Sequence, residues 1–515
     1  MVLNLCTLLR PEWVSFFVAI TIILLKKTIF IRFANYALSA IIHKLLTAAY
    51  PIYSHDSAKP IPTCPYKFPN GQGNVGKFLE GMDNSKDWKT QHGLVYRIWS
   101  GMRSEIVITR PEHVKAVFGD SDKHRKAASN NSGYLMSKLL GSCLGLKSGK
   151  EWKAIRNGIK GPFEQQNMSD HINLVQNHIS SHFRKTLNDS LLCTGLLDPA
   201  EGLKMLPFWI VAEILYGELD EDMVSDLEDI VPLRESLFTQ IINGGLTRFS
   251  LSRFLPTTAN KGMAAFQARW RAFNDRAYER AKESGRLTKP VVRMYEDVHK
   301  GLVTFEQVLQ TLDECLFANL DVTTGAISWN VIFLAADKHY QDRLGRELAL
   351  HRTVEGRHQY ILNNSTLLAS CVSESARLRP AAAFSVPQSA PTTRIVDGYI
   401  IPAGTDIIID AYSLNVRSDF WGPDADTYRP ERFLEKSSIA QRYHYWRFGF
   451  GPRQCLGKFL ADVVIRSIII YLIENYELSL TNPLEEWKRR PEVWISHPQM
   501  QVGCLPKRSQ TTEGR

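Results

Sequence analysis

The chain has 515 residues, 44% of them hydrophobic, and a formal net charge of +9 at pH 7, so it can bury a large core in one big domain or in several. Its eight cysteines are scattered without a C-x-x-C pair, which argues against a zinc site or a disulfide framework and favours a reducing compartment. The basic residues are dispersed, and the densest run, Lys123-His124-Arg125-Lys126, lacks interleaved aromatic residues. The charge therefore indicates no nucleic-acid partner, and we expect a solvated face or a docking surface for an acidic partner.

The first predicted element is a membrane anchor over residues 1–46. Trp13 to Leu25 is almost wholly apolar, Lys26-Lys27 interrupts the run, and Thr28 to Ile42 continues it. The run reaches the roughly 20 residues that span a bilayer if the two lysines extend toward the interface. Because the positive charge follows the apolar run, we expect an uncleaved signal anchor rather than a cleaved signal peptide, with the rest of the chain in the cytosol. The second apolar stretch is expected to lie on the membrane surface.

A proline-rich connector is predicted over residues 47–75, where Pro60, Pro62 and Pro65 stiffen the chain and stop the anchor helix. Within it, Gly71 to Gly76 matches the dinucleotide fingerprint G-x-G-x-x-G, but the match follows a turn sequence rather than a strand. The sequence therefore predicts no nucleotide site, and a redox reaction on this chain would need electrons from a separate protein.

The next elements are two short strands, at Leu94–Arg97 and Glu105–Thr109, where polar and apolar residues alternate. A helix is expected to begin near Lys150, and it places Trp152 and Arg156 four residues apart on one face. From about residue 170 to 286 the pattern is helical and amphipathic without a motif, and 305–337 is predicted to be a long helix.

A second helix carries Glu374 and Arg377, three apart on one face, and Arg432 lies in the sequence Tyr-Arg-Pro-Glu-Arg-Phe about fifty residues later. Two guanidinium groups against one carboxylate would form a charge-assisted network of structural importance.

The segment Trp446–Gly457 contains one cysteine, Cys455, in a glycine-rich loop before a long apolar segment. Glycines let backbone approach a large flat cofactor, and the positive end of a helix favours a thiolate. Arg453 places a cation beside the sulfur, where it could pair with a haem propionate, and Phe448 can pack on a porphyrin or on the loop. These features favour a thiolate ligand of iron over a structural cysteine.

The residues Phe448, Gly451, Arg453, Cys455 and Gly457 fill every fixed position of Phe-x-x-Gly-x-Arg-x-Cys-x-Gly. This resembles the haem-binding signature of the cytochrome P450 family. The resemblance implies haem b held by Cys455 as the axial ligand of the iron. It also implies that Trp152 and Arg156 reach the haem propionates, and that Glu374, Arg377 and Arg432 are the Glu-Arg-Arg core that fixes the cysteine loop.

The middle of the 305–337 helix resembles the family's distal pattern Ala-Gly-x-Asp/Glu-Thr-Thr at Ala318 and Asp321, but Asn319 replaces the glycine and Val322 the first threonine. The resemblance implies that Asp321 and Thr323 relay protons to dioxygen. Since they are two apart on a helix, we expect the helix to be locally unwound there, with the Asn319 side chain bonded to opened backbone carbonyls.

The family resemblance implies a mostly α-helical fold with small β-sheets, one haem-thiolate catalytic domain over residues 76–515 behind the anchor, and a substrate lid near Leu233–Phe254. It also implies that Phe384 and the turn Trp494–Pro498 line the pocket. The expected enzyme is a monooxygenase of the endoplasmic reticulum membrane that oxidises a small apolar organic substrate. Electrons would come from NADPH through cytochrome P450 reductase, with cytochrome b5 as a further donor.

The distal-helix sequence looks most like members from fungal natural-product pathways. Two alternatives stay open. A haem-thiolate isomerase or ring-rearranging oxidase is favoured by Val322, and a non-catalytic membrane haem protein would need the ligand but not Asp321.

Overall fold

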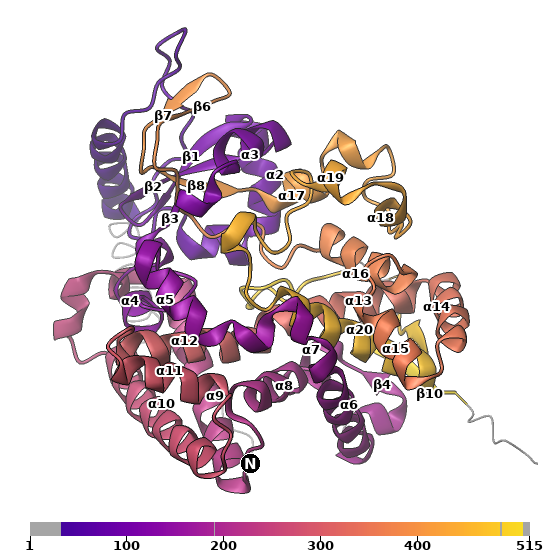
Figure 1. Cartoon of the computed structure of the whole chain (residues 1–515). Helices are drawn as coiled ribbons and strands as arrows, with labels where there is room; N and C mark the ends of the chain where they lie inside the picture. Colours follow the sequence, from indigo (N-terminus) through magenta and orange to yellow (C-terminus); the bar gives the residue numbers. More distant parts are fainter. Residues whose placement is uncertain (1–31, 190, 485–486, 508–515) are drawn as a thin grey trace, which may run out of the picture.

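The protein is mostly helical, as the computed structural model of residues 32–189, 191–484 and 487–507 shows (Figure 1). The longer α-helices of the described chain are α2 (Gly81–His92), α3 (Pro111–Phe118), α5 (Gly149–Ile159), α6 (Ser169–Asp189), α8 (Met205–Tyr216), α9 (Glu221–Asn243), α10 (Thr258–Glu283), α11 (Pro290–His299), α12 (Phe305–Ala318), α13 (Thr324–Ala336), α14 (Lys338–Leu350), α15 (Val354–Leu362), α16 (Leu367–Leu378) and α20 (Lys458–Asn475). The short ones are α4 (Tyr134–Leu139), α7 (Pro199–Gly202), α17 (Ala411–Asn415), α18 (Arg432–Glu435) and α19 (Ser438–Gln441).

The strands form three small sheets. The largest has the order β1-β2-β8-β5-β3 and the second the order β4-β10-β9, while β6 and β7 pair alone. Their bounds are β1 Val95–Ser100, β2 Arg103–Ile108, β3 Arg125–Lys126, β4 Leu196–Leu197, β5 Gln388–Ser389, β6 Arg394–Val396, β7 Tyr399–Ile401, β8 Asp406–Ile409, β9 Tyr476–Leu480 and β10 Val502–Pro506. The two strands expected near the amino end are the antiparallel hairpin β1–β2, in which Val95 lies opposite Ile108.

The predicted long helix over 305–337 is present as α12 and α13, separated by one π-helical turn, Asn319–Thr323. A capping box at Thr304 and Gln307 fixes its start. Nearly every residue of α13 is buried, as expected of a helix that is apolar on all sides and crosses the centre of a domain. It packs against α16, which carries Glu374 and Arg377, and against α20, which follows the cysteine loop.

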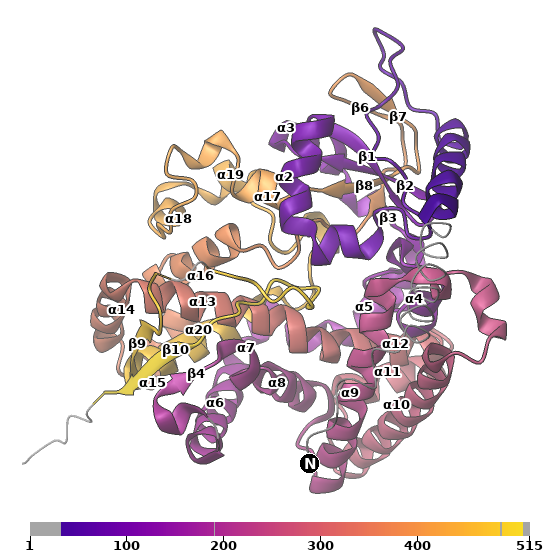
Figure 2. The same ribbon diagram turned by 180° about the vertical axis from the view of Figure 1, so that it is seen from behind.

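The described chain begins in a helix that ends at residue 49. Leu46 of this helix packs with Tyr66 and the strand residue Trp99, whereas Phe33 and Tyr36 are exposed. Figure 2 shows the helix in indigo beside the strands β1 and β2. Most of the predicted anchor lies outside the described residues, and no helix within them has both the length and the apolar composition needed to cross a bilayer.

Candidate active site

Cys455 lies in the loop between the 3₁₀ turn Gly451–Arg453 and helix α20. Its N–H donates to the Phe448 carbonyl (2.9 Å), which closes the loop on itself. The side chain has solvent-accessible surface, yet protein surrounds it densely. Burial therefore raises the pKa of the thiol, while the Gly457 N–H and the Lys458 ammonium lower it. These two groups favour the thiolate that metal ligation requires.

Arg453 of this loop meets Trp152 and Arg156 of helix α5, which are distant from it in the sequence. The guanidinium of Arg453 lies 4.7 Å from the Trp152 ring centre, and that of Arg156 lies 5.4 Å from it. Arg453 also donates to the Lys147 carbonyl (2.6 Å). Burial and the neighbouring Arg156 lower the pKa of Arg453 to about 10, although Glu314 acts in the opposite direction. Two guanidinium groups in so crowded a place provide a strong site for an anion.

Lys126 is a third cation in this group, and the sequence did not identify it. Burial, and to a smaller extent the charge of Arg453, lower the pKa of its ammonium to about 8. The expectation that the run Lys123–Lys126 forms a solvated face is therefore wrong for His124, which is buried, and only partly met by Lys126, which is half-buried. The error arose because a basic run of four is read as surface, whereas the short strand β3 directs this lysine inward.

The residues of the loop fit a haem. A single accessible sulfur with an N–H donor is the expected proximal ligand, and three cations suit the two propionates. Gly451 has a φ of +64°, and a Cβ there would collide with the Ser121 hydroxyl. Phe448 lies on the same loop, with the Arg447 guanidinium 4.4 Å from its ring centre. Arg447 in turn pairs with Asp462 (2.8 Å) on α20, which fixes the loop to the helix.

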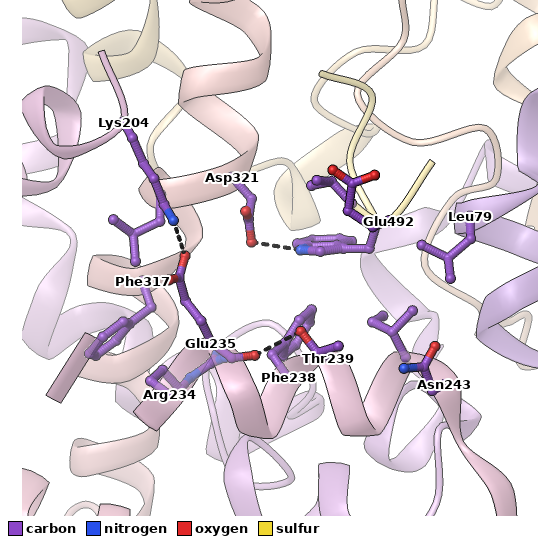
Figure 3. Close-up of a pocket in the computed structure, with 14 residues that line it drawn as sticks. Leu79, Lys204, Arg234, Glu235, Phe238, Thr239, Asn243, Phe317, Asp321 and Glu492 are labelled. Carbon is purple, nitrogen blue, oxygen red and sulfur yellow. Dashed lines mark hydrogen bonds and ion pairs between the residues drawn. The ribbon is translucent and has the colours of Figure 1, made fainter. Parts of the chain in front are cut away.

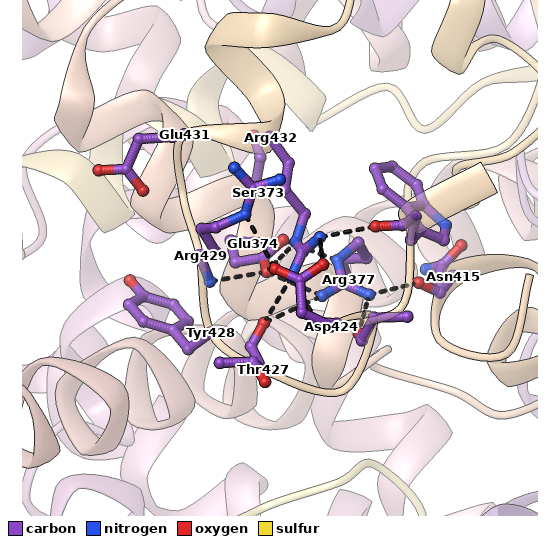
Figure 4. Close-up of polar contacts among 12 residues, drawn as sticks. Ser373, Glu374, Arg377, Asn415, Asp424, Thr427, Tyr428, Arg429, Glu431 and Arg432 are labelled. Atoms are coloured by element: carbon purple, nitrogen blue, oxygen red, sulfur yellow. Dashed lines mark hydrogen bonds and ion pairs between the residues drawn. The ribbon is translucent and has the colours of Figure 1, made fainter. Parts of the chain in front are cut away.

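The structure brings Glu374, Arg377 and Arg432 together, all with fully buried side chains (Figure 4). The Glu374 carboxylate accepts from Arg377 Nε (2.7 Å) and Nη2 (2.8 Å) and from Arg432 Nε (3.1 Å). Arg432 also pairs with Asp424 (2.8 Å), and this hydrogen bond lowers the pKa of that carboxyl to about 2. The Arg429 N–H completes the set of donors to Glu374 (3.0 Å).

This network is connected to the cysteine loop through Asn415. Arg377 donates to the Asn415 carbonyl (2.9 Å), and the Asn415 side chain both donates to the Trp446 carbonyl (2.8 Å) and accepts from the Trp446 N–H (2.7 Å). Tyr445, the preceding residue, donates to the Ser373 carbonyl (2.9 Å) beside Glu374. These hydrogen bonds fix the position of the buried ion network relative to Trp446, which begins the cysteine loop nine residues before Cys455.

The predicted distortion of the distal helix is confirmed. Residues 319–323 form the π-turn, and Asn319 Nδ2 donates to the carbonyls of Cys315 (2.7 Å) and Leu316 (3.2 Å). The Thr323 hydroxyl donates to Asn319 Oδ1 (2.8 Å). The asparagine that replaces the family glycine therefore donates hydrogen bonds to the opened backbone carbonyls and also orients the Thr323 hydroxyl.

Asp321 lines a cavity of about 260 Å³ between the distal helix, the lid helix α9 and the segment Glu492–Trp494 (Figure 3). The walls combine apolar and charged side chains: Leu79, Lys204, Arg234, Glu235, Phe238, Thr239, Ile242, Asn243, Phe317, Leu320, Asp321, Glu492, Val493 and Trp494. Three of the charged wall residues are neutralised by ion pairs, since Lys204 pairs with Glu235 (2.7 Å) and Arg234 with the buried Asp313 (2.8 Å). Helix α9 and Trp494 line this cavity as expected, whereas residues 495–498 of the expected turn are not among its walls.

Phe384 does not line this cavity, although the sequence favoured it as a substrate contact. Its ring is 1% exposed and stacks on Trp88 with the ring centres 5.5 Å apart. It belongs to an apolar cluster against the large sheet. An apolar side chain beside a pocket-lining segment can point into the pocket or pack against the large sheet. The sequence does not show that Trp88 is available on the sheet side to pack against Phe384.

A glycine-rich cysteine loop, a cationic group beside it, a buried Glu-Arg-Arg network and a distorted helix over the site together define the haem-thiolate class. The family model described as Cytochrome P450 matches residues 72–502. The chain therefore belongs to the cytochrome P450 family.

The chain is similar to fungal members of this family. It is 50% identical over 470 residues to the cytochrome P450 monooxygenase aclC of Aspergillus oryzae, covering 90% of this chain and 96% of the relative. It is 49% identical to the cytochrome P450 monooxygenase asaD of Aspergillus flavus, with 92% and 91% covered. Identity to the cytochrome P450 monooxygenase gliC of Aspergillus fumigatus is 37%, with 92% and 94% covered. The chain is thus an enzyme of the monooxygenase type.

Proposed function

We propose that this enzyme uses dioxygen and NADPH-derived electrons to insert one oxygen atom into a largely apolar organic substrate. The single observation that carries the proposal is the accessible Cys455 sulfur beside the Arg156–Trp152–Arg453 group. When bound there, the haem supplies dioxygen activation. Cys455 would hold the iron, while Arg156, Arg453 and Lys126 would hold the propionates by charge-assisted hydrogen bonds.

The distal residues would supply protons to the site. Asp321 lies on the cavity wall, and the Thr323 hydroxyl is oriented by Asn319. A carboxylate that exchanges protons with water in the cavity and a nearby hydroxyl are suitable groups for general acid catalysis. The roles of both residues are part of the proposal.

We further propose that the substrate belongs to fungal secondary metabolism, in keeping with the likeness to fungal relatives. The mixed walls of the cavity suit a molecule with an apolar body and a few hydrogen-bonding groups. Electrons would come from a membrane-bound NADPH–cytochrome P450 reductase, with cytochrome b5 as a second donor, at the endoplasmic reticulum. The apolar amino-terminal run supports an anchor there with the catalytic domain in the cytosol.

The test combines metabolite comparison with isotopic labelling. Extracts of cells with and without the protein identify a metabolite that is consumed, and that metabolite is then incubated with purified holoenzyme, reductase and NADPH under ¹⁸O₂. The proposal predicts a product with one labelled oxygen atom and NADPH consumption that depends on the metabolite. A product without labelled oxygen would contradict oxygen insertion.

A second function is favoured by Val322, which stands where the family pattern has its first threonine. An isomerisation or ring rearrangement needs no retained oxygen atom in the product. An unlabelled, isomeric product in the same experiment would support this alternative.

A further inference from the structure

The segment Trp494–His497 contacts the π-turn at several points. Trp494 Nε1 donates to the Asp321 carboxylate (2.7 Å), a hydrogen bond drawn as the dashed line from Asp321 in Figure 3, and His497 Nε2 donates to the Asp321 carbonyl (2.7 Å). Because a carbonyl only accepts, Nε2 carries the proton. Burial lowers the pKa of His497, which favours the neutral imidazole with this one tautomer. One residue of the distal helix is therefore held by both its side chain and its backbone.

The same segment approaches α13 very closely. A Cβ on Gly325 would lie 2.8 Å from His497 Cδ2 and 3.0 Å from Ile495 Cγ2. Trp329 donates to the Ser496 carbonyl (2.8 Å) one turn further along. The contact thus depends on a glycine in the helix, and the segment is fixed to both the π-turn, at Asp321, and α13, at Trp329.

Trp494 also faces the cavity that Asp321 lines. Its ring centre lies 5.0 Å from that of Phe238 on the lid helix α9 and 5.9 Å from that of Phe78 near the amino end. A molecule that enters the cavity, or a shift of α9, must therefore act on the indole whose N–H holds Asp321. Loss of the indole N–H would leave the carboxylate free to turn toward the cavity.

We propose that Trp494–His497 is a clamp that sets the orientation of Asp321, with Trp494 as a positioning residue that couples occupancy of the cavity to proton delivery. The inference rests on the proposed function, because it concerns the protons that dioxygen reduction consumes. Two electrons and two protons convert dioxygen to hydrogen peroxide, whereas four of each convert it to two water molecules. A misoriented carboxylate favours release of peroxide.

The structural half of the proposal is tested by hydrogen–deuterium exchange on the full-length holoprotein. Trp494→Phe keeps a ring in contact with Phe238 but removes the N–H donor. We expect the amides of residues 319–323 to exchange on the order of 10-fold faster, the factor for loss of one hydrogen bond to a charged group. The control is Trp487→Phe, since that ring packs on Phe333 (5.1 Å). Equal exchange in Trp494→Phe and the wild type would overturn the clamp.

The chemical half is tested by a double-mutant cycle. With reductase, NADPH and the consumed metabolite identified by the comparison above, the fraction of consumed dioxygen that appears as hydrogen peroxide is measured for the wild type, Trp494→Phe, Asp321→Asn and the double variant. We expect several-fold more peroxide in each single variant and no further rise in the double variant, because Trp494 acts through Asp321. Additive effects, or an unchanged fraction in Trp494→Phe, would overturn the positioning role. A wild-type holoprotein that consumes no NADPH even with that metabolite added would instead contradict the proposed function, and the exchange experiment would still decide the clamp.

Discussion

Replacement of Glu374 by Gln tests how strongly the buried ion network holds the fold. The carboxylate is fully buried and accepts hydrogen bonds from two guanidinium groups and one backbone N–H. Gln has nearly the same shape but no charge, so Arg377 keeps only backbone carbonyls as further acceptors, while Arg432 keeps Asp424 (2.8 Å). Removing one partner of a buried ion pair costs about 3–5 kcal/mol. Because Arg432 keeps its contact with Asp424, we expect the free energy of unfolding to fall by about 3 kcal/mol.

The assay is urea unfolding of the holoprotein, followed by haem absorbance and by far-ultraviolet circular dichroism. The matched control is Glu435→Gln, which makes the same substitution in a more exposed pair with Arg429 (2.7 Å). Exposed pairs contribute about 0–1 kcal/mol, so the control should unfold close to the wild type. If Glu374→Gln loses no more stability than Glu435→Gln, the network does not hold the cysteine loop.

Three further predictions concern proton delivery, topology and pH. Thr323→Ala should keep haem but divert NADPH electrons to peroxide, with product falling about 10- to 100-fold, as for loss of a general acid; unchanged coupling would point to substrate-assisted or rearrangement chemistry. If the catalytic domain is cytosolic, endoglycosidase should cause no mobility shift, and a shift would contradict the orientation, because the chain has sequons at Asn130, Asn167, Asn188, Asn363 and Asn364. Burial raises the pKa of Asp406 to about 6 from 3.8, so the folded state binds the proton more tightly and stability falls as pH rises through this window. Asp406→Asn should remove that fall: between pH 5 and pH 7.5 in urea titrations, its free energy of unfolding should rise by about 1.4 kcal/mol relative to that of the wild type. Parallel pH profiles of the two proteins would refute the assignment.

Local patterns in the sequence were enough to predict much of the site. The cysteine loop, the Glu374–Arg377 spacing and the Trp152–Arg156 spacing each lie within one turn or one helix, where geometry follows directly from residue number. Asn319 was also interpretable, because an amide side chain within a helix can bond carbonyls three and four residues before it, as it does.

The contacts that could not be predicted join segments far apart in the chain. Trp494 and Asp321 are 173 positions apart, and nothing in the sequence around either residue predicts that they are hydrogen-bonded. The position of Lys126 in the cationic group depends on the pairing of β3 with β5. Each of these strands has only two residues, which is too short to give a periodic pattern in the sequence. Asn415, which links the ion network to Trp446, lies in a five-residue helix. These contacts are set by tertiary packing rather than by local propensity.

The central claim, that Cys455 is the proximal ligand of a haem iron, is tested most directly by the spectrum of the reduced protein with carbon monoxide. The account predicts the strongly red-shifted Soret band of thiolate ligation in the wild type, its loss in Cys455→Ser, and its retention when Cys315 or Cys371, which are less accessible, is replaced by Ser. A normal band in Cys455→Ser would contradict the account.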